Sequence, residues 1–189
     1  KKYIVNIFDY LPFGNDDFYH KKSSHTKKNY DISFIGTADS KRYIYLKNLS
    51  DFKLIIGGDG WNKFKLSKNV TYVGNVDNKK FSELINLSHL SLNILRDQND
   101  YSHNMKTFEI PAMGGLMITK RTKEQKYFFP ENKACLMYSD LVELKTKIRK
   151  VLKNPKKFHK VSKKAYKLSK YYSYKNRAKQ ILNSLSDND

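Results

Sequence analysis

The sequence predicts an α/β fold: a doubly wound, mostly parallel Rossmann-like sheet with extra helices at the carboxyl end. Short apolar runs alternate with amphipathic segments from about residue 30 onward, several runs end in glycine, and there is no internal repeat. Such alternation is typical of parallel strands joined by crossover helices. A chain of 189 residues is also long enough for one domain with a full hydrophobic core.

The first half of this domain contains four predicted strands with helices between them. The strands are residues 31–36, 52–57, 70–74 and 89–94. Asp39 and Asp77 stand where helices begin, because a carboxylate at that position accepts a hydrogen bond from the first turn. The apolar residues after these caps recur at helical spacing and are predicted to face the core: Tyr43, Leu46, Leu49, Phe81, Leu84 and Ile85.

The second half begins with a short helix over residues 106–113, followed by strands at 116–118 and 134–138. The last strand contains the single cysteine, Cys135, which we expect to be a buried small hydrophobe. In a sheet of this kind, ligands bind beyond the carboxyl ends of the strands, at the point where the strand order reverses. The glycines that end strands are predicted to lie at that edge: Gly36, Gly57, Gly58 and Gly74.

Three helices are predicted to complete the chain. Asp140 and Glu143 resemble a capping box at the start of the first. Pro155 suits the first position of the second helix, because proline lacks an N–H that would need a partner there. Ser173 is predicted to cap the third, whose apolar residues are expected to be buried: Ala178, Ile181, Leu182 and Leu185.

The amino-terminal segment differs in composition from the rest. An apolar run at residues 3–8 precedes a turn, and residues 15–29 are polar and rich in lysine, which is typical of a linker entering a domain near Tyr30. The first residue is not Met, so we expect the chain to be part of a longer protein.

The chain carries a formal net charge of +19, mostly from lysine. Two interpretations stay open: a solvated lysine surface, or a basic patch for a phosphate-rich ligand or an anionic membrane. One cysteine allows no intrachain disulfide and fits a reducing compartment. Because no stretch has the length of a membrane-spanning helix and no signal-peptide pattern opens the chain, we predict a cytoplasmic protein.

The densest group of functional residue types is residues 102–115, which follow a strand and open a helix. Backbone N–H groups at a helix start, with Lys106 nearby, suit a phosphate. The two oxygens of Glu109 can accept both hydroxyls of a ribose. From the residues alone, an amphipathic helix with Lys106 and Glu109 facing solvent is an open alternative.

Residues 106–115, KTFEIPAMGG, resemble the R/K-x-F-E-x-x-A-x-G signature of GT-B glycosyltransferases, and are most similar to the CgeB-like (spore maturation protein) group. Further pieces resemble the same group in the same order. They are residues 30–37 followed by Arg42, the glycine-rich turn 57–61, the turn 73–76, the strand 92–94 and the closing helix 174–182.

The resemblance implies a domain that binds a nucleotide sugar, UDP- or GDP-linked, and transfers the sugar to an acceptor. It implies no cofactor and no metal. Residues 1–29 would be the tail of an amino-terminal domain with the interdomain linker, and residues 30–189 the donor-binding domain. The acceptor would be held by the amino-terminal domain of the same protein, so we expect this chain alone to transfer no sugar.

The resemblance also implies individual roles. Glu109 would hold the ribose hydroxyls, and Lys106 would stabilise the donor diphosphate as a point charge where the group more often carries Arg. The turn at residues 74–76 would contact the base. The complete set of implied donor contacts is Gly36, Arg42, Gly74, Asn75, Val76, His103, Asn104, Lys106, Thr107, Glu109, Gly114 and Gly115.

Several of these residues have a second interpretation. Arg42 would also suit the surface of its helix, and His103 would suit an ordinary polar loop. Trp61 is more typical of a core or interdomain anchor than of a ligand-stacking residue. We predict no metal site at Asp97, Asp100 or the pair Asp16-Asp17, because no D-x-D-like pair follows a strand.

Two other function classes stay open. The fold would also suit a non-catalytic domain that binds nucleotide sugars. The lysines and tyrosines of residues 150–172 resemble the footprint of a nucleic-acid-binding module. However, the lysines occupy nearly every non-apolar position there, which is typical of a solvated face, and no nucleic-acid motif accompanies them. We therefore expect no nucleic acid partner, and we expect the same face to suit an anionic membrane surface.

Overall fold

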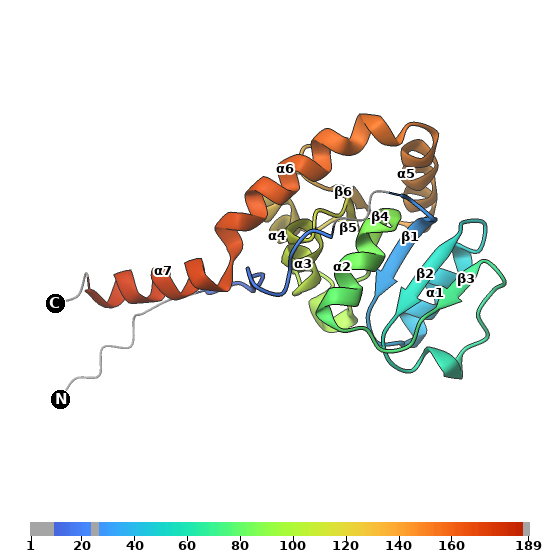
Figure 1. The fold of residues 1–189 in the computed structure, drawn as a ribbon, viewed down its shortest axis with the longest axis horizontal. Coiled ribbons are helices and arrows are strands. Elements are labelled where there is room, and N and C mark those ends of the chain that lie inside the picture. Colours follow the sequence, from blue (N-terminus) through green and yellow to red (C-terminus); the bar gives the residue numbers. More distant parts are fainter. Residues whose placement is uncertain (1–9, 24–26, 187–189) are drawn as a thin grey trace.

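The computed structural model describes residues 10–23 and 27–186, and it contains one six-stranded sheet in the order β3-β2-β1-β4-β5-β6 (Figure 1). Every pairing between neighbouring strands is parallel. The strands are β1 (Tyr30–Ile35), β2 (Leu54–Gly57), β3 (Val70–Tyr72), β4 (Ser88–Asn93), β5 (Met117–Lys120) and β6 (Leu136–Tyr138). The predicted Rossmann-like fold is therefore confirmed.

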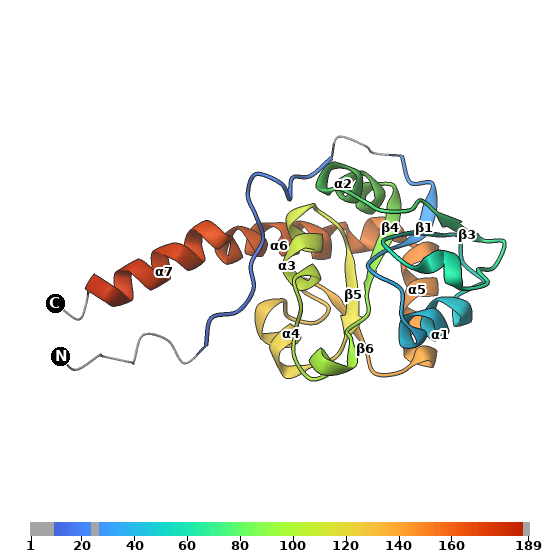
Figure 2. The same ribbon diagram turned by 90° about the horizontal axis from the view of Figure 1, so that it is seen from below.

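Helices cover both faces of the sheet (Figure 2). They are α1 (Ser40–Asn48), α2 (Asn78–Asn86), α3 (Lys106–Ala112), α4 (Lys123–Phe128), α5 (Leu141–Lys153), α6 (His159–Ser169) and α7 (Tyr174–Ser186). Four 3₁₀ turns connect other elements: Trp61–Lys63, Asp97–Asn99, Pro155–Phe158 and Lys170–Tyr172. No described helix is both long enough and apolar enough to cross a bilayer.

Two apolar clusters make up the core, one on each face of the sheet. On one face, Leu46 of α1 and Ile148 of α5 pack against strand residues such as Ile32. On the other face, helices α2, α3 and α6 and the end of α4 supply a second cluster that includes Phe108 and Ala165. Helix α1, which links β1 to β2, therefore lies on one face of the sheet. Helices α3 and α4, which link β4 to β5 and β5 to β6, lie on the other face.

The strand order reverses between β1 and β4, which are neighbours at the centre of the sheet. The next strand along the chain from β1 is on one side, and the next from β4 is on the other. The loops that follow β1 and β4 therefore diverge, and this leaves a crevice at the carboxyl edge where such sheets bind ligands.

The capping residues behave as the sequence predicts. The side chains of Asp39, Asp77 and Asp140 each accept a hydrogen bond from a backbone N–H in the first turn of their helix, at 2.7–2.8 Å. The capping box at α5 is incomplete, because Glu143 Oε2 accepts from Ser139 N rather than from the Asp140 N–H. Helix α4 was not predicted; it has six residues, too few for its apolar spacing to identify it.

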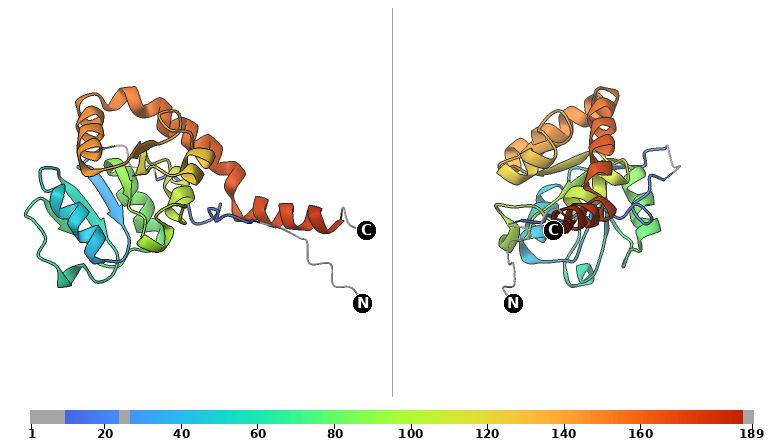
Figure 3. Two further views of the ribbon diagram at one scale, coloured as in Figure 1. Left: turned by 180° about the vertical axis from the view of Figure 1, so that it is seen from behind. Right: turned by 90° about the vertical axis from the view of Figure 1, so that its left-hand side faces the viewer.

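The prediction that α7 buries an apolar face is wrong. Leu182 is 61% exposed and Leu185 is 45% exposed, because α7 projects away from the α/β body (Figure 3). The amino-terminal segment pairs with the start of this helix. Asn15 N donates to Tyr172 O at 3.0 Å, and Tyr174 N donates to Asn15 O at 2.9 Å. The apolar run at residues 3–8 lies outside the described residues.

Glycine allows three loops to meet at the carboxyl edge. Gly36 N donates to Gly57 O, and Gly58 N donates to Gly74 O, at 2.9 and 2.8 Å. A Cβ on Gly58 would lie 2.4 Å from Gly36 O, and the φ of Gly58 is +119°. Both the close approach and the backbone conformation therefore require glycine at this position.

We expect Gly58→Ala to lower the free energy of unfolding by roughly 3 kcal/mol, because the methyl group meets a backbone oxygen and the residue must keep a strained φ. Gly60→Ala is the matched control. It also has a positive φ of +80°, but its Cβ would meet nothing nearer than Ala38 Cβ at 3.5 Å. Its cost should be about 1 kcal/mol by urea denaturation. Equal losses in the two variants would show that the close loop contact is unimportant.

Candidate functional site

Helix α3 begins at the crevice between β1 and β4, and paired amides fix its start. Asn93, the last residue of β4, and Asn104 exchange two side-chain hydrogen bonds of 3.0 and 2.9 Å. Asn104 Oδ1 also accepts from Thr107 N at 3.1 Å, so the side chain of Asn104, which precedes the helix, pairs with a backbone N–H of its first turn. The buried end of β4 therefore holds the amino terminus of α3 in one position.

Glu109 lies one turn into α3 and is shielded from solvent. Its side chain is only 5% exposed, and its Oε2 is 2.7 Å from the Lys106 ammonium. Lys106 Nζ also lies 4.1 Å from the centre of the Phe81 ring on α2. The alternative that Glu109 faces solvent on an amphipathic helix is wrong, because α2 and the amino-terminal segment enclose this face of α3.

His20 is the residue of the amino-terminal segment that covers Glu109. Its Nε2 lies 3.7 Å from Glu109 Oε1, and Asp16 N donates to its Nδ1 at 2.9 Å. Burial is the largest influence on the pKa of His20 and lowers it. The charge of Glu109 acts in the opposite direction, but the net pKa is still lowered. The ring is therefore neutral at pH 7 with its proton on Nε2, and the Nε2–H is directed to the carboxylate side.

His103 lies in the loop before α3, as the second interpretation has it, and its side chain is buried. Its Nδ1 is 2.6 Å from Glu124 Oε2, and Phe13 N donates to its Nε2 at 3.3 Å. Ser102 Oγ donates to the same Glu124 oxygen. Burial opposes ionisation of Glu124, but the hydrogen bonds from Ser102 and His103 outweigh it and lower the pKa of the carboxyl. His103 thus joins the α4 helix to the amino-terminal segment.

Arg42 connects the two loops on either side of the crevice. It is 8% exposed, and its guanidinium donates to Thr37 O at 2.9 Å and to Ile94 O at 3.2 Å. Thr37 follows β1 and Ile94 follows β4. Arg42 is therefore not a surface residue, and its bonds go to backbone carbonyls that shape the crevice.

The other predicted site residues divide into two groups. Gly36, Gly74, Asn75 and Val76 lie in the loops at the carboxyl edge, where Asn75 is exposed. Gly114 and Gly115 lie at the opposite end of α3, before β5. A Cβ on Gly115 would lie 2.6 Å from Ile85 Cγ2, so close packing of α2 on α3 accounts for that glycine.

Trp61 is a core residue, as the sequence favours. It is fully buried, and its Nε1 donates to Gly36 O at 2.8 Å. Cys135 is also buried as predicted, and burial raises the pKa of its thiol to about 12.

Three of the four acidic residues considered for a metal bind other groups of the protein. Asp97 and Asp100 both accept from Lys41, at 2.8 and 2.7 Å. Asp16 Oδ1 accepts from the backbone N–H of Phe18 and Tyr19. Within residues 10–23 and 27–186, no three His, Cys, Asp or Glu side chains form a metal-binding group. A metal-independent reaction stays a prediction.

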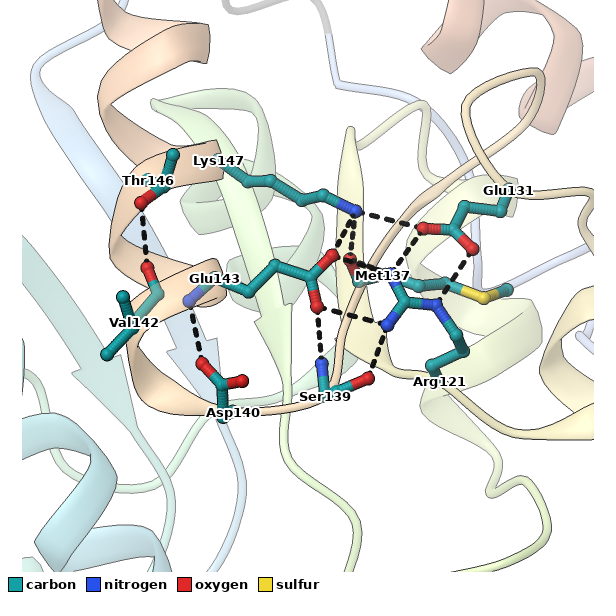
Figure 4. Close-up of polar contacts among 9 residues, drawn as sticks. All are labelled: Arg121, Glu131, Met137, Ser139, Asp140, Val142, Glu143, Thr146 and Lys147. Atoms are coloured by element: carbon teal, nitrogen blue, oxygen red, sulfur yellow. Dashed lines mark hydrogen bonds and ion pairs between the residues drawn. The ribbon is translucent and has the colours of Figure 1, made fainter.

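A charge network that sequence analysis did not predict lies beside β5 and β6 (Figure 4). Arg121, directly after β5, donates to Glu131 and to Glu143, with N–O distances of 2.7 and 2.6 Å to its Nη2. Lys147 Nζ lies 2.9 Å from an oxygen of each carboxylate. These hydrogen bonds hold the pKa of both Glu131 and Glu143 at about 2 and raise the pKa of Arg121. The network joins α5 to the carboxyl edge of the sheet.

The model of the family described as "Glycosyl transferase-like" matches residues 42–183. Comparison with curated proteins gave no match.

Solved structures show the same fold at low sequence identity. Sucrose-phosphate synthase from Thermosynechococcus elongatus has a TM-score of 0.74 at 14% identity, over 94% of this chain and 51% of that one. HepE from Anabaena, solved in complex with UDP-glucose, has a TM-score of 0.71 at 14% identity, over 92% and 56%. A DNA-modifying β-glucosyltransferase has a TM-score of 0.64 at 18% identity, over 89% and 54%. The chain thus spans about half the length of these proteins.

We expect Glu131→Gln to lower the free energy of unfolding at pH 7 by about 2 kcal/mol, because it removes the charge on one side of a largely shielded pair. The pKa of Glu131 is about 2 in the folded protein, below the value of about 4.3 for an unfolded chain. The stabilisation that ionised Glu131 gives to the folded protein is therefore complete at a pH above the unfolded pKa, and it is lost as the pH falls toward 2.

The measurement is urea denaturation of both proteins at pH 7 and at pH 3. The difference between them should shrink at the lower pH. Asp51→Asn is the control, because Asp51 is 61% exposed in its pair with Arg149 and should cost little. A Glu131→Gln difference that does not change with pH would contradict the assignment.

Proposed function

Since this chain belongs to the glycosyl transferase-like family, we propose that it is the donor-binding domain of a CgeB-like GT-B glycosyltransferase. One observation carries the proposal: the KTFEIPAMGG segment forms the helix that starts at the crevice between β1 and β4, with Lys106 and Glu109 in contact on its first turn. Residues 1–29 would comprise the tail of an amino-terminal domain and the linker, and residues 30–189 the donor-binding domain.

In this proposal Glu109 binds the ribose of a nucleotide sugar. Its Oε1 faces the Nε2–H of His20 at 3.7 Å, which is longer than a hydrogen bond, so this oxygen has unused acceptor capacity. Ribose hydroxyls would take the place of His20 beside Oε1 and of the Lys106 ammonium beside Oε2. Donor binding therefore requires the segment at residues 16–20 to move from α3.

Lys106, released from Glu109, would stabilise the diphosphate together with the amino terminus of α3. Charge develops on the diphosphate as the anomeric bond breaks, and fixed positive groups lower the energy of that state. Gly36 would admit the diphosphate closely, and the turn at residues 74–76 would contact the base. Since Arg42, His103 and Asn104 already bind other protein groups, we assign them the positioning of the crevice loops.

Other parts of the reaction would lie outside this chain. Inverting transfer needs a general base for the acceptor hydroxyl, which we expect from the amino-terminal domain, along with the acceptor itself. The UDP-glucose in the HepE structure supports a UDP-linked sugar as the first donor to test. Contact with an anionic membrane, and a reaction without a metal, are further parts of this proposal.

Two alternatives keep the fold and change the function. A regulatory domain would bind the nucleotide sugar without catalysing transfer. A nucleic-acid-binding module would use the lysines of residues 150–172, from the end of α5 through α6, and one structural neighbour is a DNA-modifying enzyme. The shielded Glu109–Lys106 pair favours the nucleotide-sugar reading, because a phosphate-backbone site would not need a buried carboxylate.

We expect UDP and UDP-glucose to bind the chain, and Glu109→Gln to weaken both by roughly tenfold or more, since the variant loses two charge-assisted hydrogen bonds. Isothermal calorimetry measures the effect, with GDP and GDP-linked sugars run alongside. Glu83→Gln on α2 is the control, because its side chain is 26% exposed and pairs only loosely with Lys80 at 3.9 Å. If UDP and GDP nucleotides all fail to bind the folded wild-type chain, the proposal is wrong.

We also expect the chain by itself to transfer no sugar to water or to an added acceptor, because the general base and acceptor site would be elsewhere. Release of UDP from UDP-glucose, measured over hours against a protein-free blank, tests this. Turnover that Glu109→Gln abolishes would instead place the complete active site within these residues.

A further inference from the structure

A cavity with a volume of about 610 Å³ lies between the amino-terminal segment and the helices at the carboxyl end. It is bounded by residues 15–22, by the end of α6 and by the start of α7. Ala112, at the carboxyl end of α3, also lines it. This end of α3 is opposite to the end that begins at the donor crevice, and His20 is the residue that lines the cavity and also faces Glu109.

The cavity is strongly basic. Its lining includes five lysines, which are Lys21, Lys22, Lys170, Lys175 and Lys179. Asp17 is the single acidic residue that lines it in the described part of the chain. Since His20 is neutral at pH 7, the lining has a surplus of four positive charges.

Among the described residues, none of the five ammonium groups lies within 4 Å of a carboxylate, whereas Lys41, Lys106, Lys120 and Lys147 all do. Like charges that converge on one cavity repel one another and raise the local concentration of anions. The lysines that line the cavity therefore differ from these paired lysines, and the cavity favours an anionic ligand.

One buried polar atom in the lining of the cavity has no partner among the described residues. Asn15 lines it and is 2% exposed, and both backbone groups of Asn15 bond to residues 172 and 174. Its side-chain Oδ1 is buried and accepts no hydrogen bond from any described residue. A buried acceptor left unpaired is unfavourable, so a ligand hydroxyl that donates to it would strengthen binding.

We propose that this cavity binds a small hydroxylated ligand with two separate phosphate groups, such as a polyol bisphosphate. Each phosphate carries a charge of about −1.5 to −2 at pH 7, so two phosphates match the surplus of four. Lysine is a common point-charge partner of phosphate, and the volume is within the range of small-ligand sites. The hydroxyl donates to Asn15 Oδ1. The five lysines of the site are not among the residues assigned to the donor, although the cavity shares His20 with the segment that covers Glu109.

The test measures binding of inorganic pyrophosphate and of fructose 1,6-bisphosphate by calorimetry, with UDP as the comparison. The variant is Lys175→Ala with Lys179→Ala; both lysines are exposed on α7, so the fold should be unaffected. It should weaken both phosphate probes at least tenfold and leave the UDP affinity unchanged. Lys150→Ala with Lys153→Ala, on α5, removes the same charge away from the cavity and should change neither.

Asn15→Ala tests the contact to the ligand hydroxyl separately from the contacts to its phosphates. It should weaken the hydroxylated bisphosphate several-fold and leave pyrophosphate nearly unchanged, since only the first donates a hydroxyl. Equal losses in the two double-lysine variants would overturn the proposal, because binding would then follow net charge alone. Binding to vesicles of anionic phospholipid or to DNA, without binding of either soluble probe, would also overturn it.

Discussion

The site depends on how closely backbone can approach backbone at the carboxyl edge of the sheet. Gly58 lies against the carbonyl of Gly36 with no room for a side chain, and its N–H bonds to Gly74. The loops after β1, β2 and β3 are therefore held as one surface. Arg42 extends this surface to the loop after β4 through two carbonyl contacts. The crevice is thus shaped mainly by backbone geometry, and the functional side chains are placed on it.

Helix α3 connects the two regions that we assign to ligands. Its start is fixed by the paired amides of Asn93 and Asn104, and its first turn presents Lys106 and Glu109. Its carboxyl end contributes Ala112 to the basic cavity. His20 touches both regions, because it lines that cavity and faces Glu109. A ligand in either region therefore contacts the same short segment of chain.

Local rules in the sequence were sufficient for most of the fold. Strand and helix order, the three aspartate caps and the buried Trp61 follow from alternation, capping chemistry and residue size. The burial of α7 could not be predicted in this way, because its apolar spacing is the same whether the helix covers this domain or extends beyond it. The burial of Glu109 and His103 also escaped prediction, since both are covered by the amino-terminal segment, many positions away along the chain.

The indole of Trp61 has a practical use. It is the chain's sole tryptophan, and its Nε1–H bonds to the carbonyl of Gly36 in the loop that borders the crevice. Indole emission responds to the loss or lengthening of such a bond. The protein therefore contains its own optical reporter for displacement of that loop, and fluorescence can follow occupancy of the crevice without any attached dye.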